Sequence, residues 1–263
     1  MTHPALQGRI AVVTGASRLG GIGAAICRRL ARDGADIFFT HWGAYDASVN
    51  GCGEERDYPE KLAEELRAFG VRAVHRAAEM SLTDAPAAIM NAAEQELGTP
   101  TILINNATHC ESVGYKEITA AILDQHHAVN VRGTIMLSME FARRFERVHA
   151  GRAPGRIISL ISSGDDPNNL AYLTTKGAIA AWTEPAAASL APLGITVNAI
   201  DPGPTDTGWM TPAFKLQLQA MFPMGRIGQP EDAAKLIGFL ASDDAQWITG
   251  QRIASNGGFP SPL

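Results

Sequence analysis

The chain has 263 residues, of which 46% are hydrophobic and 19% are charged, and its formal net charge is −5. These values are typical of a globular protein of one or two domains, and the acidic balance argues against nucleic acid as the main partner. The three cysteines form no C-x-x-C pair, so they indicate neither a disulfide framework nor a metal site. No apolar run is long enough to cross a bilayer and no signal peptide is evident, so we expect a cytoplasmic protein without membrane contact.

Short β-branched runs alternate with helical patterns along the whole chain. The pattern predicts strands over 9–14, 35–40, 71–76, 101–104, 156–161, 195–200 and 251–255. It predicts helices over 22–33, 58–69, 84–96, 118–147, 170–191 and 230–241. Several strands are apolar on both faces, as in a sheet that helices cover on both sides. The sequence therefore predicts a single α/β domain over residues 1–263, a Rossmann-type doubly wound parallel sheet of about seven strands.

A glycine-rich turn, "TGASRLGGIG" (14–23), joins the first predicted strand to the first predicted helix. Ligands of a doubly wound sheet bind beyond the carboxyl ends of its strands, and a pyrophosphate can dock there on a helix N-terminus. Glycines allow the backbone to approach such a ligand closely. The literal G-x-G-x-x-G string is absent, however, so the turn alone is equally consistent with an ordinary strand–helix loop.

Five segments in chain order resemble motifs of the short-chain dehydrogenase/reductase family, and the 3-oxoacyl-(acyl-carrier-protein) reductases in particular. The turn matches the T-G-x-x-x-G-x-G motif of the family if Leu19-Gly20 is a two-residue insertion. The other four segments are "INNAT" (104–108), "VNVRG" (129–133), "YLTTK" (172–176) and "DPGPTDT" (201–207). The resemblance extends over about residues 7–258. Each segment alone is a weak signal, but five in order at the expected places are a strong one.

The resemblance implies a catalytic group made of Asn130, Ser162, Tyr172 and Lys176. Tyr172 and Lys176 lie four residues apart, on one face of a helix. Tyr172 would be the acid/base of hydride transfer between a ketone and a secondary alcohol (EC 1.1.1.-), and Lys176 would favour its phenolate. Ser162 would stabilise the substrate oxygen, and Asn130 would hold a water that relays protons to Lys176. Ser159 has the usual family separation from Tyr172, but it falls inside a strand, and choosing Ser162 leaves a shortened loop before Tyr172.

The resemblance also implies a nicotinamide cofactor. An NAD-preferring site places an acid at the end of the second strand, where this chain has Thr40 followed by His41. Asp36 lies at the start of that strand, at the wrong edge of the sheet. Arg18 stands in the turn where NADP-preferring members often carry a base, so we expect NADP(H), with NAD(H) as the alternative. The expected cofactor-binding residues are Gly15, Ser17, Arg18, Gly21, Ile22, Gly23, Thr40, His41, Glu79, Met80, Asn106, Ala107, Tyr172, Lys176, Pro202, Gly203, Thr205 and Thr207.

Other features leave alternatives open. Residues 205–225 resemble the mobile substrate lid of the family, with a packed surface helix as the alternative. Enoyl-thioester reductases also have a longer glycine turn, but six residues separate their tyrosine and lysine, whereas three separate Tyr172 from Lys176. A non-catalytic dinucleotide sensor or scaffold and an NAD-dependent alcohol dehydrogenase are the rival functions. Carbonyl substrates from 3-oxoacyl thioesters to small and polycyclic ketones fit. The family implies a homo-oligomer, a tetramer or a dimer, and Pro185 is expected to kink the predicted helix 170–191.

Overall fold

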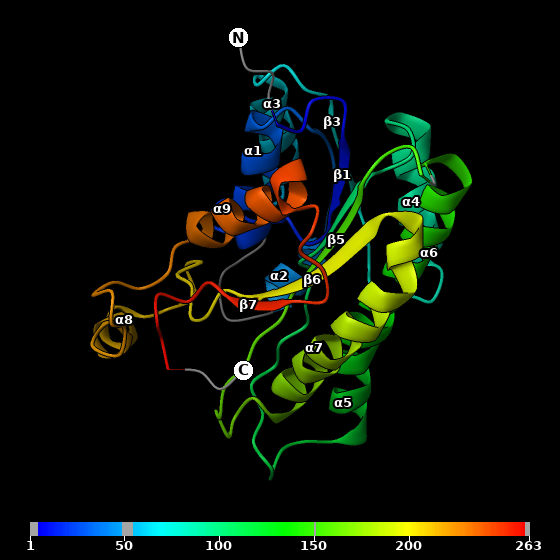
Figure 1. The fold of residues 1–263 in the computed structure, drawn as a ribbon. Helices are drawn as coiled ribbons and strands as arrows, with labels where there is room; N and C mark the ends of the chain where they lie inside the picture. Colours follow the sequence, from blue (N-terminus) through cyan, green and yellow to red (C-terminus); the bar gives the residue numbers. More distant parts are fainter. Residues whose placement is uncertain (1–4, 49–54, 150, 261–263) are drawn as a thin grey trace.

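The computed structural model describes residues 5–48, 55–149 and 151–260 and contains one parallel sheet, in the order β3-β2-β1-β4-β5-β6-β7 (Figure 1). Every neighbouring pair of strands is parallel. The strands are β1 (Ile10–Val13), β2 (Asp36–His41), β3 (Ala73–Ala77), β4 (Ile102–Asn105), β5 (Gly155–Leu160), β6 (Ile195–Asp201) and β7 (Arg252–Ala254). The predicted doubly wound sheet is confirmed, and its order reverses between β1 and β4, where ligands of such sheets bind.

Helices cover both faces of the sheet (Figure 1). They are α1 (Ile22–Arg32), α2 (Gly43–Ser48), α3 (Tyr58–Arg67), α4 (Ala85–Glu96), α5 (Ala120–His126), α6 (Thr134–His149), α7 (Leu170–Leu190), α8 (Pro212–Gln219) and α9 (Pro230–Ala241). Helices α1, α3 and α9 pack with Val13 and Phe39 on one face, whereas α4, α6 and α7 pack with Val12 and Phe38 on the other. This alternation along β1 and β2 buries both faces, as the apolar runs predict. No described helix is long and apolar enough to cross a membrane.

The predicted helix 118–147 is interrupted by a π-helical segment. Helix α5 continues through η1 (His127–Gly133) into α6, and Asn130 lies within the wider turns of η1. Such segments are rare and occur frequently at functional sites. Helix α7, in contrast, runs through Pro185 without interruption, so the proline does not end it. Two short 3₁₀ turns, η2 (Ala191–Leu193) and η3 (Asp243–Ala245), complete the described elements.

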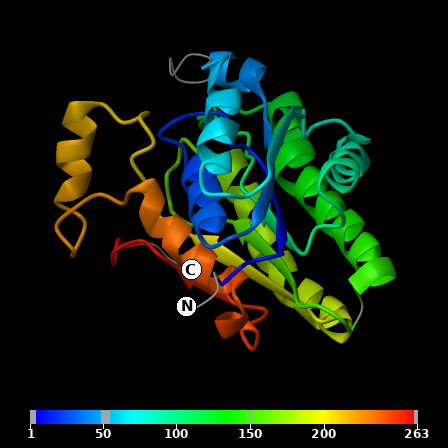
Figure 2. The same cartoon turned by 90° about the horizontal axis from the view of Figure 1, so that it is seen from above.

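Two helices have no counterpart in the sequence prediction. Helix α2 follows β2 directly, and its six residues are too few to show helical periodicity. Helix α8 lies within the segment expected to form a lid and stands apart from the layers in both views (Figures 1 and 2). It has a small apolar cluster of its own, formed by Met210, Leu218, Phe222 and Ile227. The lid segment is therefore packed within itself and is separate from the two main cores.

Candidate active site

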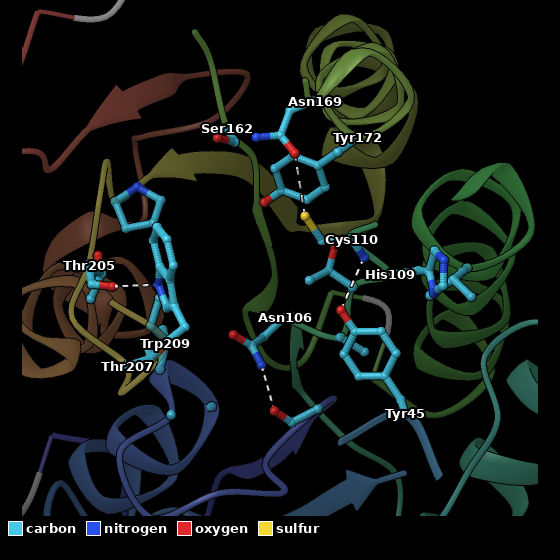
Figure 3. A pocket seen from close by; sticks show the side chains of 18 of the residues that line it. Tyr45, Asn106, His109, Cys110, Ser162, Asn169, Tyr172, Thr205, Thr207 and Trp209 are labelled. Carbon is cyan, nitrogen blue, oxygen red and sulfur yellow. Dashed lines mark hydrogen bonds between the residues drawn. The ribbon is translucent and has the colours of Figure 1, made fainter. Parts of the chain in front are cut away.

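A cavity of about 750 Å³ opens at the carboxyl edge of the sheet (Figure 3). The segments that follow β1, β2, β4, β5 and β6 all contribute to its wall. Trp209 lies across the cavity from Tyr45 and His109, and Ser162 and Tyr172 lie between them (Figure 3). The five motifs that the sequence suggests therefore meet around one space.

The glycine turn is locked against the end of β4. Gly15 has a φ of +76°, and a Cβ there would lie 2.7 Å from the Cα of Ala107. A Cβ on Gly23 would lie 2.5 Å from the carbonyl oxygen of Gly15. The Asn106 amide donates hydrogen bonds to the carbonyls of Thr14 (2.8 Å) and Gly15 (2.9 Å). Only glycine fits at both positions, so this turn is a close-packed feature of the site and differs from an ordinary loop.

The two-residue insertion lies on the outer side of the turn. The Leu19 amide donates to the carboxylate of Glu55 (3.1 Å), and Arg28 donates to the Leu19 carbonyl (3.3 Å). The Leu19 side chain is 60% exposed, and neither Leu19 nor Gly20 lines the cavity. Gly21 therefore keeps its place as N-cap of α1 and borders the cavity in spite of the insertion.

Thr40, near the end of β2, is hydrogen-bonded to the glycine turn, and it is not the acid that an NAD-preferring site would have there. Thr40 is 1% exposed, and its hydroxyl and carbonyl oxygens accept hydrogen bonds from the amides of Gly15 (3.3 Å) and Ala16 (2.8 Å). Arg18 is not a free cation, because its Nε lies 3.4 Å from a carboxylate oxygen of Asp46 on α2. Asp46 was not anticipated from the sequence, since α2 was not.

Ser162, Tyr172 and Lys176 come together at the end of β5 and the start of α7. Ser162 and Tyr172 both line the cavity, and Ser162 is among the groups that act on the pKa of the Tyr172 hydroxyl. Nζ of Lys176 donates to the Leu160 carbonyl (2.9 Å) and lies 5.6 Å from the centre of the Tyr172 ring. Ser159, in contrast, is buried within β5, does not line the cavity, and accepts a hydrogen bond from the Asn105 side-chain amide (3.2 Å). The spacing along α7 thus brings the tyrosine hydroxyl to the cavity and leaves the lysine behind it.

Burial dominates the ionisation of this group. It raises the pKa of the Tyr172 hydroxyl, although Ser162 acts in the opposite direction. It also lowers the pKa of Lys176 to about 8, against the raising effects of nearby Cys110 and Asp201. In the cofactor-free protein burial is the largest influence on the Tyr172 hydroxyl, and the expectation that Lys176, together with the charged nicotinamide, favours the phenolate stays a prediction for the complex. Tyr172 carries its proton at neutral pH.

The Asn130 side chain makes hydrogen bonds with the loop after β4 and with α7. Its oxygen accepts from Thr108 Oγ1 (3.1 Å) and the His109 amide (2.7 Å). Its amino group donates to the His109 carbonyl (2.8 Å) and to Thr175 Oγ1 (2.9 Å). These four bonds use the full capacity of an amide. A relay water would therefore have to bind a neighbouring backbone group rather than this side chain.

Asp201 is a site residue that the sequence prediction missed. The side chain is 1% exposed, and it accepts hydrogen bonds from the Ser163 amide (2.9 Å), the Ser163 hydroxyl and the Gly203 amide (2.9 Å). The carboxylate thus joins the turn after β5 to the turn after β6. A signal was available, because the strand predicted over 195–200 is followed at once by an acid, directly before Pro202-Gly203.

The substrate end of the cavity was also largely missed. The Tyr45 hydroxyl, from α2, accepts a hydrogen bond from the Cys110 amide (3.1 Å), and Cys110 Sγ lies 3.9 Å from Asn169 Oδ1 (Figure 3). Opposite them, Trp209 Nε1 donates to the Thr205 carbonyl (3.2 Å). Trp209 and Thr205 lie in segments that the sequence prediction included, whereas no motif of the family marks Tyr45, Cys110 or Asn169, which only the fold brings together.

Most of the predicted residues border the cavity. Lys176 and Asn130 are the two that do not, because they lie behind its wall. No group of three His, Cys, Asp or Glu side chains suited to a metal ion occurs in the described ranges. The predicted residues that line the cavity are Gly15, Ser17, Arg18, Gly21, Ile22, Gly23, Thr40, His41, Glu79, Met80, Asn106, Ala107, Ser162, Tyr172, Pro202, Gly203, Thr205 and Thr207.

Known proteins resemble this chain over nearly its whole length. A family model described as "Enoyl-(Acyl carrier protein) reductase" matches residues 15–260. The "Uncharacterized oxidoreductase YjdA" of Bacillus subtilis is 49% identical, over 98% of this chain and 99% of the relative. The "3-oxoacyl-[acyl-carrier-protein] reductase FabG" of Pseudomonas aeruginosa is 33% identical, over 96% of this chain and 98% of the relative.

Solved structures agree with these relatives. The "Short-chain dehydrogenase/reductase from Serratia marcescens BCRC 10948" has a TM-score of 0.85 and 33% identity, with 97% of this chain and 99% of that chain covered. A short-chain dehydrogenase of Burkholderia cenocepacia in complex with NADP has a TM-score of 0.84 and 31% identity, with 97% and 98% covered. The chain belongs to the short-chain dehydrogenase/reductase family and is an NAD(P)-dependent oxidoreductase.

Proposed function

We propose that this protein is an NADP(H)-dependent oxidoreductase that interconverts a ketone and a secondary alcohol. The observation that carries the proposal is the group of Ser162, Tyr172 and Lys176 at the carboxyl edge of the sheet. Tyr172 and Ser162 line the same part of the cavity, and the buried Lys176 ammonium lies 5.6 Å from the centre of the Tyr172 ring.

Each member of the group has a distinct task in the proposed reaction. Bound NADP(H) supplies or accepts the hydride. Tyr172 donates its hydroxyl proton to the carbonyl oxygen during reduction and recovers a proton from the alcohol during oxidation. Its raised pKa keeps that proton in place until negative charge develops on the substrate. Ser162 hydrogen-bonds the same oxygen. Lys176 has two N–H donors left beyond the one on Leu160, and we assign them to the nicotinamide ribose.

The glycine-rich turn between β1 and α1 fits the phosphates of a dinucleotide. The close contacts of Gly15 and Gly23 bring the backbone of the turn to the N-terminus of α1, where phosphate groups are favourable. The preference for NADP(H) over NAD(H) rests on Arg18 beside the cavity and on the absence of an acid at Thr40. The complex of the Burkholderia protein with NADP and that of a metagenomic blue fluorescent protein with NADPH, 31% identical, support this choice.

We propose a carbonyl substrate with an apolar part. The apolar side chains of Trp209, Phe214, Leu218 and Phe259 line the cavity on the side of α8. Residues 205–225 would act as its lid, and a 3-oxoacyl thioester is one candidate because relatives named as such reductases are 33% identical. We further propose a homo-oligomer, a tetramer or a dimer. Phe239 and Trp247, 42% and 95% exposed, are apolar surface that such assembly would cover, and light scattering that shows a monomer would refute it.

The test follows NADPH and NADH absorbance across 3-oxoacyl thioesters, small ketones and polycyclic ketones. We expect turnover of at least one class with NADPH. Replacing Arg18→Ala should weaken NADPH binding about 10- to 100-fold, because a charge-assisted hydrogen bond to phosphate contributes roughly 1.5–3 kcal/mol. Arg143→Ala, at an exposed arginine on α6, is the matched control.

Three outcomes would contradict the proposal in different ways. Equal efficiency with NADH, together with an Arg18→Ala variant of unchanged NADPH affinity, would favour the NAD-dependent alcohol dehydrogenase. NADPH binding without turnover of any carbonyl would favour the non-catalytic sensor. Failure to bind either cofactor would refute both.

A further inference from the structure

A chain of hydrogen-bonded side chains leads from the cavity to the outer surface of α3. His41 ends β2 and lines the cavity. Its Nε2 lies 3.1 Å from Nδ1 of His75 on the neighbouring strand β3. Nε2 of His75 lies 3.0 Å from a carboxylate oxygen of Glu60 on α3, and the His75 ring stacks on Phe39 at 5.4 Å. The stacking and the two hydrogen bonds fix the position of His75.

The carboxylate at one end of the chain determines where the protons lie. Glu60 can only accept, so Nε2 of His75 carries the hydrogen of that bond. In neutral His75, Nδ1 is then an acceptor, and Nε2–H of His41 donates to it. This leaves Nδ1 of His41 as its unprotonated nitrogen, and no group in the described parts of the chain hydrogen-bonds it. His41 is therefore held ready to gain a proton at Nδ1.

The corner of the cavity around His41 contains both cations and carboxylates, with Arg18 and Arg56 beside Asp46 and Glu55. Arg18 is 3.4 Å from Asp46, so its charge is partly neutralised. A phosphate on the adenine ribose carries close to two negative charges at neutral pH. Protonation of His41 would add a further cation at this corner, beside Arg18 and Arg56.

We propose that His41 takes up a proton when the 2′-phosphate of NADP(H) binds, so that His41, with His75 and Glu60 behind it, makes the choice of NADP(H) over NAD(H) depend on pH. The inference rests on the proposed NADP(H) site and adds a specificity-determining residue to it. NAD(H) lacks this phosphate, so its binding brings no negative charge to His41 and leaves the protonation of His41 unchanged.

The sign of the effect follows from the surroundings of His41. In the free protein burial, and then the like charge of His75, hold the pKa of His41 below its usual value. A bound phosphate dianion raises that pKa. NADPH affinity is therefore highest at acidic pH and falls as the pH rises through the pKa of the complex. The charged and titratable groups near this corner are Arg18, Asp46, Glu55, Arg56, Glu60, His75 and Glu79.

Isothermal titration calorimetry at about pH 7.5, in buffers of different ionisation enthalpy, counts the protons taken up when NADPH binds. We expect net uptake for the wild type with NADPH and none with NADH. The 2′-phosphate has a second pKa near 6, and if it binds as the dianion it can only release protons. Net proton uptake therefore comes from the protein, and net release from the phosphate. The NADPH Kd should rise roughly threefold to tenfold between about pH 6.5 and about pH 8.5, and the NADH Kd should stay flat.

Two variants and a control complete the test. His41→Gln should abolish both the uptake and the pH dependence. His75→Gln should retain them but move the change to higher pH, since the like charge that lowers the pKa of His41 is gone. His149→Gln, whose imidazole bonds the Thr99 carbonyl at the far end of α6, should behave as the wild type.

The outcomes separate this inference from the proposed function. NADPH binding without proton uptake, or with uptake that persists in His41→Gln, would overturn the inference and leave the NADP(H) assignment intact. Binding of NADH alone would overturn the assignment itself, and with it the inference.

Discussion

Replacing Asp201→Asn tests how the buried carboxylate supports the active site. The carboxylate accepts two hydrogen bonds from Ser163 on one oxygen and one from the Gly203 amide on the other. An asparagine can present its oxygen to only one side, so at least one amide donor then faces an NH₂ group. A hydrogen bond to a charged group contributes about 1.5–3 kcal/mol, and we expect the free energy of unfolding to fall by about that amount.

The same variant should change the pH dependence of the reaction. Asp201 is among the lesser causes, after burial, that raise the pKa of Tyr172, and it also raises that of Lys176. Without the negative charge both pKa values fall. The rate of alcohol oxidation, which needs deprotonated Tyr172, should therefore reach its maximum at lower pH. Urea unfolding gives the stability, and kcat measured across pH gives the shift.

A matched control separates the buried site from carboxylate removal in general. Glu96→Gln removes a surface carboxylate that is 39% exposed and pairs with Arg76, itself 53% exposed. Exposed ion pairs contribute about 0–1 kcal/mol, so this variant should be nearly silent in both assays. An Asp201→Asn protein of wild-type stability and unchanged pH profile would refute the reasoning.

Three further predictions concern the turn, the lysine and the lid. Gly23→Ala places a Cβ 2.5 Å from the Gly15 carbonyl oxygen and should raise the NADPH Kd at least about tenfold by calorimetry, whereas an unchanged Kd would contradict the close packing. Lys176→Met should abolish activity but raise the free energy of unfolding by about 1–3 kcal/mol at neutral pH. Burial lowers the pKa of Lys176 to about 8, so below that pH the folded wild type contains a buried charge that destabilises it and that methionine lacks. That gain should shrink as the pH rises from about 8 to about 10.5, where the wild-type lysine loses its proton, and a constant gain in unfolding experiments would refute it. Trp209→Ala removes the donor to the Thr205 carbonyl and part of the apolar wall of the cavity. It should raise KM for apolar carbonyls and leave the NADPH Kd unchanged. A variant in which only the NADPH Kd changes would contradict a role of Trp209 in substrate binding.

The sequence predicted the sheet well because each strand carries its own signal. β-branched runs that are apolar on both faces mark buried strands, and all seven lie within two residues of the predicted ranges. Helix α2 was missed because six residues hold less than two turns of periodicity. The π-helical turns of η1 were missed because seven residues within a longer helical pattern are too few to show a separate period.

The residues of the candidate site likewise fall into those that stand in a local motif and those that only the fold brings to the site. Gly15, Tyr172 and Lys176 stand in motifs with fixed spacing, and the structure brings those motifs together. Asp46 and His75 come from segments without a motif, and they reach the cofactor corner only through α2 and the pairing of β2 with β3. Long-range contacts of this kind depend on the fold and leave no local pattern in the chain.

The central claim is that Tyr172 is the proton donor to the carbonyl oxygen, and Tyr172→Phe tests it most directly. The substitution removes one oxygen and leaves Lys176 and its bond to the Leu160 carbonyl in place. With a carbonyl that the wild type reduces, we expect kcat to fall about 10²- to 10⁴-fold, while NADPH still binds. Unchanged turnover by a folded Tyr172→Phe protein would contradict the account.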